Sequence, residues 1–171
     1  MGDSYKEIMV KQKQTPFDRV GKVLMIFGII LLVLAGFVIN PIMLLFAVGG
    51  IFAFSYFSAG FNREYEYLYV NGDLDVDVIK NRQRRKKQGS YALNQLQMAA
   101  PEGSHDLDSY LASGKVVIKD FCSHVEGDKV TCLVYDQEDH RVMIKVNLDD
   151  EVLTDMKRRD PRKFSRDLGI I

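Results

Sequence analysis

Charged side chains are absent from one long part of this sequence. Residues 23–61 contain no Asp, Glu, Lys or Arg, although the chain of 171 residues carries 23 acidic and 23 basic side chains. A helix of a soluble protein shows a polar face, and the apolar runs in this stretch show none. The distribution of charge therefore argues against an ordinary soluble fold for residues 23–61 and divides the chain into parts with different surroundings.

The sequence also lacks the short motifs of common catalytic and nucleotide-binding sites. It contains no GxSxG, no P-loop, no HExxH and no GxGxxG after a predicted strand. Its two cysteines, Cys122 and Cys132, form no CxxC pair, which structural zinc sites nearly always contain in this or a related form. These absences predict no catalytic residue, no metal site and no cofactor.

Five side chains keep an alternative open. Cys122 and His124 are two residues apart and would share one face of a strand, with Cys132 on a nearby strand and His140 in a turn. Cys122 with His124 or His105 could form a nucleophilic dyad, and the cysteines with His124 could hold a metal. Buried free cysteines and surface histidines are the expected state, so we predict that the protein is not an enzyme.

The uncharged stretch predicts a transmembrane helical hairpin over residues 23–61. Two apolar runs, 23–39 and 42–61, each reach about 25 to 30 Å as helices, which matches the hydrocarbon core of a bilayer. Asn40 and Pro41 separate them. Proline suits the first turn of a helix, and asparagine suits the position that caps it.

The flanking charges predict the orientation of this hairpin. Basic residues lie on the outer flanks of both helices and none lies in the turn; they are Lys11, Lys13, Arg19, Lys22 and Arg63. Positive flanks stay on the cytoplasmic side, so we expect a multi-pass protein of the cell membrane with both termini in the cytoplasm. Nothing in residues 1–22 resembles a cleavable signal. Residues 5–11 fit either a strand or an interfacial segment.

A hairpin opens the predicted cytoplasmic domain, residues 62–160. Asn71-Gly72 is a strong signal for a two-residue turn between strands. The register that this turn sets places two groups of side chains on one face, which should be the buried one: Tyr65, Tyr67 and Tyr69 with Leu74, Val76 and Val78. Asp73, Asp75 and Asp77 fall on the other face, which we expect to be solvated.

These aspartates do not fit a calcium loop of the EF-hand type. Such a loop needs glycine at its sixth position and glutamate at its twelfth, where this sequence has Val78 and Arg84. Further β-branched runs predict about six strands in all, and residues 148–159 predict a helix that ends at Asp160-Pro161. Residues 161–171 read as a C-terminal tail.

This order of elements resembles the bacterial pleckstrin-homology-like (PH-like) domains, in which an antiparallel sheet is closed by a C-terminal helix. The whole chain resembles a group of small bacterial membrane proteins with two N-terminal helices before such a domain. The stretch "EYEYLYVNGDLDVDVIKNRQRRKK" carries the resemblance. It implies an antiparallel β-rich (α+β) PH-like fold after a transmembrane hairpin, and it implies no activity.

The basic run after the hairpin is the predicted binding site. Its six cations lie within eight residues and could attract anionic phospholipid headgroups: Lys80, Arg82, Arg84, Arg85, Lys86 and Lys87. In eukaryotic relatives of the fold a basic loop holds phosphoinositides. A solvated loop that only reinforces topology is the alternative, and nucleic acid is not an expected partner because no aromatic residue interrupts the run. The sequence therefore predicts a membrane-anchored interaction module that engages anionic lipid or a protein partner; alternatively, the protein is an accessory subunit of another membrane protein.

Overall fold

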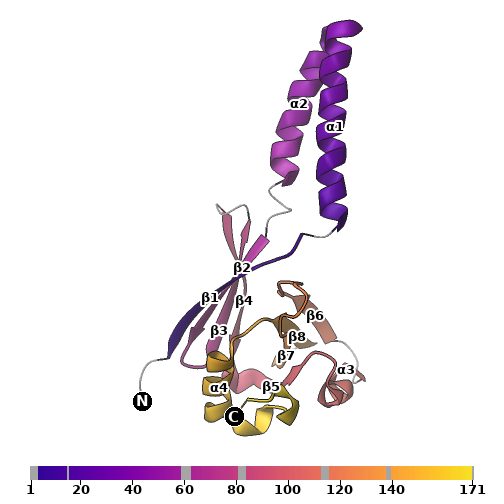
Figure 1. Cartoon of the computed structure of the whole chain (residues 1–171). Helices are drawn as coiled ribbons and strands as arrows, with labels where there is room; N and C mark the ends of the chain where they lie inside the picture. The colour runs from indigo at the N-terminus through magenta and orange to yellow at the C-terminus, as the bar shows by residue number, and fades with distance from the viewer. Residues whose placement is uncertain are drawn as a thin grey trace. The chain divides into compact units, whose positions relative to one another are not determined.

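The structure is a computed structural model that describes residues 4–14, 16–58, 63–80, 84–112, 116–137 and 140–170. The chain forms two compact units. One, here the β unit, comprises Met1–Gln12, Glu64–Ile79 and Arg85–Ile171. The other, here the helical unit, comprises Lys13–Arg63 and Lys80–Arg84. Figure 1 shows the elements of each unit.

Two apolar helices make up most of the helical unit. They are α1 (Pro16–Val38) and α2 (Ile42–Ser58), and they pack side by side (Figure 1). The side chain of Asn40 accepts a hydrogen bond from the N–H of Ile42 at 3.0 Å, as expected for the residue that caps α2. Near the turn the helices approach closely, because a Cβ atom added to Gly36 would lie 2.6 Å from the side chain of Leu44.

The predicted membrane hairpin is supported in part. Of the described helices, α1, with 23 residues, is the one long and apolar enough to cross a bilayer by length and composition. The apolar helix α2 has 17 residues and reaches about 25 Å, slightly less than a hydrocarbon core of about 30 Å. The predicted second span ran to residue 61, and residues 59–62 lie outside the described part.

Eight strands in two four-stranded sheets appear in the part of the chain that the structure describes. The first sheet, here sheet A, has the order β1-β2-β3-β4. Its strands are β1 (Tyr5–Lys11), β2 (Arg63–Val70), β3 (Asp73–Lys80) and β4 (Arg84–Ala92). Two of them were not foreseen as strands: residues 5–11 were left open, and residues 84–92 contain most of the supposed basic loop.

The turn between β2 and β3 has the conformation that the sequence predicts. Asn71 and Gly72 both have positive φ, 51° and 108°, as a two-residue turn of type I′ requires. The predicted inner face is buried throughout; its members are Tyr65, Tyr67, Tyr69, Leu74, Val76 and Val78. The alternating pattern of this hairpin therefore predicted correctly which of its faces is buried.

The strand β1 makes the start of the chain part of the β unit. It pairs antiparallel with β2 over its full length, from Tyr5 opposite Val70 to Lys11 opposite Glu64. The partly buried side chains of Ile8 and Val10 pack against the main core. Residues 5–11 are thus a strand, and the β unit includes residues on both sides of the helices.

The second sheet, here sheet B, has the order β5-β7-β8-β6. Its strands are β5 (Leu96–Pro101), β6 (Val116–Asp120), β7 (Thr131–Gln137) and β8 (His140–Val146). The prediction of antiparallel pairing holds for β5 with β7 and for β7 with β8, but β6 pairs parallel with β8. The reason is that β8 inserts between β6 and β7, so β6 and β8 run in the same direction.

Short helices close the β unit. Ser104 caps η2 (His105–Leu107), which leads into α3 (Asp108–Ala112), and η1 (Leu93–Gln95) precedes β5. The C-terminal helix α4 (Asp150–Arg159) buries the predicted stripe of Val152, Leu153 and Met156. These three side chains belong to the main core, which also contains residues of both sheets.

The prediction of a free tail over residues 161–171 is wrong. After α4 come η3 (Pro161–Lys163) and η4 (Arg166–Leu168), and the side chain of Phe164 between them is buried in the main core. The N–H of Ser165 donates to the carbonyl of Ala99 at 2.8 Å. Too few apolar residues lie here to form a periodic pattern, so no sequence signal indicated that Phe164 is buried.

Tyr67 connects sheet A to the segment that follows β6. Its side chain has no exposed surface, and its hydroxyl donates to the carbonyl of Phe121 at 2.6 Å. The same hydroxyl oxygen accepts from the N–H of Asn147 at 3.5 Å. Burial raises the pKa of this phenol well above its ordinary value, so the hydroxyl keeps its proton and remains a donor.

We predict that Tyr67→Phe lowers the free energy of unfolding by about 1 to 3 kcal/mol, because it removes the hydroxyl that binds a buried carbonyl and a partly buried N–H. Thermal unfolding of the full chain in mild detergent measures the effect. The control is Tyr5→Phe, since Tyr5 is 63% exposed and should tolerate the change. Equal melting temperatures for Tyr67→Phe and the unaltered chain would contradict the structural role of this hydroxyl.

Candidate functional site

The six cations of the predicted binding site do not form one loop. Lys80 ends β3 and Arg84 begins β4, and both belong to the helical unit. Arg85, Lys86 and Lys87 continue β4 within the β unit. The sixth, Arg82, lies outside the described residues. The basic run is therefore divided between two units, and most of it is a strand.

Arg85 is held by acidic side chains of the neighbouring strands. Its Nε donates to Oδ2 of Asp77 on β3 at 2.5 Å, and its Nη2 lies 2.8 Å from Oε2 of Glu66 on β2. The contact with Glu66 is an ion pair and not a hydrogen bond, and within the described part of the chain the buried Oε2 of Glu66 has no hydrogen-bond partner. Arg85 on β4 thus forms ion pairs with one acid on β3 and one on β2.

Lys87, two residues after Arg85 on β4, forms a similar ion pair with Asp75 on β3. Its Nζ lies 3.1 Å from Oδ1 of Asp75, and the hydroxyl of Ser90 also hydrogen-bonds to this carboxylate. These contacts, with the Ser90 hydrogen bond as the largest influence, lower the pKa of Asp75. Asp75 and Asp77 are therefore partly buried partners of the basic strand, and the prediction of a solvated aspartate face holds only for Asp73.

Glu66 is the most buried acid of this face, with 6% of its surface exposed. Desolvation raises its pKa, and a hydrogen bond with the carboxyl group of Glu7 on β1 raises it further. Arg85 opposes this rise, while Asp77 adds to it. The charged groups that face Glu66 thus come from β1, β3 and β4, and with desolvation as the largest cause the pKa of Glu66 is raised.

The remaining described cations of the run are exposed: Lys80, Arg84 and Lys86. Lys80 and Arg84 share the helical unit with other bases, and Asp18 is its one acid. Because α1 and α2 are joined by a short turn, the start of α1 and the end of α2 lie at the same end of the pair. We call the bases of this unit the basic end: Lys13, Arg19, Lys22, Arg63, Lys80 and Arg84.

Sequence reasoning missed the acidic partners of the run. The available signal was the arrangement "DVDV" followed after a short gap by "RRKK", since a second hairpin would place these segments side by side. Opposite charges on adjacent strands stabilise each other, so a basic strand next to an acidic one could have been expected. Glu66 gave no such signal, because an isolated glutamate in an alternating strand predicts an exposed side chain.

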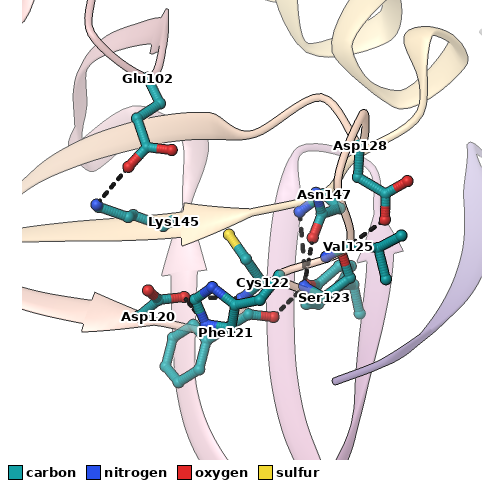
Figure 2. Close-up of polar contacts among 11 residues, drawn as sticks. Glu102, Asp120, Phe121, Cys122, Ser123, Val125, Asp128, Lys145 and Asn147 are labelled. Atoms are coloured by element: carbon teal, nitrogen blue, oxygen red, sulfur yellow. Dashed lines mark hydrogen bonds and ion pairs between the residues drawn. The ribbon is translucent and has the colours of Figure 1, made fainter. Parts of the chain in front are cut away.

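The segment after β6 contains two residues of the alternative site, Cys122, labelled in Figure 2, and His124. It is a loop and not a strand, so Cys122 and His124 do not share a strand face. Cys132 lies in β7, and His140, predicted in a turn, is the first residue of β8. The carboxylate of Asp120 accepts from the backbone N–H of Cys122 at 3.0 Å and lies 3.4 Å from Nε2 of His124. His105 lies elsewhere, in η2, and contacts Asp108 at 3.1 Å.

Buried polar groups of this loop bind one another. The hydroxyl of Ser123 donates to Asp128 at 2.5 Å and accepts from the N–H of Val125 at 3.2 Å. The N–H of Ser123 donates to the side chain of Asn147 at 2.7 Å. Figure 2 shows these contacts converging on Ser123. Ser123 is 3% exposed. Its hydroxyl both donates and accepts a hydrogen bond within the loop, so it has a structural role.

Neither cysteine has the properties of a reactive thiol. Both are free and buried, and desolvation raises the pKa of Cys122 to about 12 and that of Cys132 to about 11. A nucleophilic or metal-binding cysteine acts as a thiolate, which such pKa values disfavour. The described residues contain no group of three side chains that could hold a metal ion.

Comparison with known families adds one finding to this geometry. A family described as a bacterial PH-like domain (DUF6106) matches residues 2–166, which include both helices, both sheets and α4. The chain belongs to this bacterial PH-like domain family. No curated protein and no solved structure matches it. Membership confirms the resemblance to bacterial PH-like domains and the β-rich PH-like fold with helices, but it does not confirm two membrane-spanning helices.

In this PH-like domain we predict that Glu66→Gln stabilises the fold more at pH 7.5 than at pH 4. A raised pKa in the folded state means that the stability linked to Glu66 is complete below its ordinary pKa of 4.5 and is lost as the pH rises through the folded value. Glutamine imitates the protonated acid and removes this loss. Melting temperatures of the full chain across this pH range give the difference between variant and unaltered protein.

The control for this measurement is Glu126→Gln, which neutralises an exposed acid in the loop after β6. Its effect should not change with pH in the same direction. If Glu66→Gln is instead less stable at pH 7.5, the ion pair with Arg85 outweighs desolvation and the pKa of Glu66 is not raised.

Proposed function

We propose that the protein is a membrane-anchored, non-catalytic interaction module of the cell membrane, with both termini in the cytoplasm. Its cytoplasmic part, which comprises the β unit and the bases next to it in the chain, would engage anionic lipid or a protein partner. The observation that carries this proposal is the surface of the helical unit. Gly36 is the one buried residue of α1, and Ala47 is the one buried residue of α2.

Large apolar side chains cover both helices. Phe37 is 78% exposed and Phe52 is 73% exposed, and many other aliphatic and aromatic residues of α1 and α2 are at least half exposed. Apolar surface in water costs about 25 cal/mol per Å², so this helix pair requires an apolar environment. A bilayer provides one, and two antiparallel helices would return the chain to the side on which it started.

Reporter fusions test the orientation. We predict that green fluorescent protein fused at either terminus is fluorescent, and that alkaline phosphatase fused at either terminus is inactive, because the basic flanks hold both ends in the cytoplasm. A fusion in the turn at residue 40 is the control and should give active phosphatase. Recovery of the full chain in the soluble fraction, or active phosphatase at one terminus, would contradict the proposed two-span topology.

The basic end supports the choice of anionic lipid as a ligand. Counted over the described residues, it concentrates six cations and one acid in the unit that would enter the bilayer. Each cation near an anionic leaflet contributes about 1 kcal/mol, and the attraction is lost within a Debye length. Lys80 and Arg84 are exposed, whereas Arg85 and Lys87 are paired with acids of sheet A, so the first two are better candidates for lipid contact.

A lipid-retention experiment tests this choice on the full chain. The protein is reconstituted in vesicles of equal phosphatidylglycerol and phosphatidylcholine, extracted in mild detergent, and analysed by native mass spectrometry. We predict that Lys80→Gln with Arg84→Gln lowers the ratio of retained anionic to zwitterionic lipid by about threefold or more. The charge-matched control is Arg162→Gln with Arg166→Gln, two exposed arginines of the β unit.

Three results bear on the lipid proposal. A loss confined to the Lys80 and Arg84 variant, and reduced by salt, supports lipid recognition at the basic end. An unchanged ratio in that variant contradicts it and leaves the cations with a role in topology alone. An equal loss in the control variant would also contradict it, because the attraction would then follow net charge and no particular surface.

An accessory subunit of another membrane protein is the second candidate. The observation in its favour is the open space beside Gly28 and Gly49, where an added Cβ would meet nothing within 4 Å. Small residues allow another helix to approach closely in a membrane. Co-purification of a defined membrane protein in mild detergent, lost when Gly28 and Gly49 are replaced by Leu, would favour this candidate.

A further inference from the structure

The two sheets end in four edge strands, and three of them are protected. An unpaired edge exposes backbone N–H and C=O groups that can pair with another strand, and proteins block such edges with charges or with covering segments. Charged side chains interrupt β1, which contains Lys6, Glu7 and Lys11. Four consecutive cations begin β4. The edge of β5 is covered, since Ala99 bridges to Phe164 and accepts from the N–H of Ser165.

The fourth edge strand, β6, is less protected, because its charged residues, Lys119 and Asp120, stand only at its end. Among the described residues it pairs with β8 alone, and it lies at the end of sheet B (Figure 1). Its sequence begins with three β-branched residues, Val116, Val117 and Ile118. Val117 is 43% exposed and Ile118 is 52% exposed, so two consecutive aliphatic side chains are open to solvent beside an unpaired backbone.

The two exposed side chains lie on opposite faces of the sheet. Val117 is opposite Val142 of β8, on the side of the main core, and Ile118 is opposite Met143, on the side of the smaller core. A strand added to β6 would therefore extend both faces and cover both residues, whereas a ligand bound on one face would cover one. The exposed pair thus fits strand addition better than binding on a single face.

We propose that β6 pairs antiparallel with β6 of a second copy of this chain, about a two-fold axis through Ile118. Such pairing joins two copies of sheet B into one continuous sheet. It places Ile118 opposite its own copy, Val117 opposite Lys119 and Val116 opposite Asp120. The interface is isologous, as a closed dimer requires.

The charge pattern of β6 favours a second copy as the occupant. The antiparallel register places no two like charges opposite each other, because Lys119 and Asp120 both face valines of the partner. A parallel arrangement would stack each charge on its copy and is disfavoured. The aliphatic start of one strand also lies beside the charged end of the other, where the long stem of Lys119 can cover it.

Cysteine cross-linking of the full chain tests the pairing. Residues directly opposite in an antiparallel pair have Cα atoms about 4.5 to 5.5 Å apart, which is within the range of a disulfide. We expect Ile118→Cys to give a disulfide-linked homodimer in membranes under mild oxidation. The native thiols should react slowly, because Cys122 and Cys132 are buried. The control is Val125→Cys, at an exposed loop position of similar accessibility, 45%.

A second variant separates this interface from contacts between membrane helices. Ile118→Lys places like charges opposite each other on the axis and should lower the dimer fraction several-fold in light scattering after size-exclusion chromatography in mild detergent. The residue is half exposed, so the melting temperature should change little, which distinguishes a lost interface from a lost fold.

The proposal predicts a dimer that cross-links at residue 118, does not cross-link at residue 125, and dissociates with Ile118→Lys. Absence of the residue-118 cross-link overturns it. So does a dimer that persists in Ile118→Lys, because the helices would then hold it together. Cross-linking of Ile118→Cys to a different protein overturns the choice of occupant and assigns the edge to that partner. None of these outcomes depends on lipid recognition at the basic end.

Discussion

The register of the β2–β3 hairpin is the constraint on which the rest of the β unit depends. The positive φ angles at Asn71 and Gly72 fix a two-residue turn, and the turn decides which side chains face inward. A slip of β3 by one residue against β2 would move Leu74, Val76 and Val78 out of the core and bring the aspartates of β3 into it. The inner face of β2 also carries Tyr67, whose hydroxyl donates to the carbonyl of Phe121 and so links sheet A to the loop after β6.

The same register organises the charged face on the other side of sheet A. It brings Asp75 and Asp77 beside Lys87 and Arg85, and it places the buried Glu66 between Arg85 and Glu7. A basic sequence therefore does not imply a basic surface. Two of the five described cations that a reader of the sequence would assign to a ligand, Arg85 and Lys87, are paired with acids within the fold.

The position of the helices within the chain has a structural consequence. They are inserted between β1 and β2, which are adjacent antiparallel strands of one sheet. The β unit is consequently built from residues on both sides of the helical unit, and a fragment that begins after α2 would lack an edge strand. Residues at the start and the end of the chain meet in this unit as well, since Lys6 of β1 forms ion pairs with Asp149 and Glu151 at the start of α4.

The sequence by itself determined the elements whose signals are local. Hydrophobicity and periodicity predict the apolar residues 23–58, the inner face of β2 and β3, and the buried stripe of α4. Turn chemistry predicts the turn at Asn71-Gly72, and the stretch from Glu64 to Lys87 indicates the PH-like family. Only the tertiary structure decided the non-local features: the strand β1, the strand nature of residues 84–92, the insertion of β8 beside β6, and the burial of Phe164. Their physical reason is shared, because each depends on pairing or packing with residues distant in the chain, and a charged strand or a lone phenylalanine carries no sign of its partner.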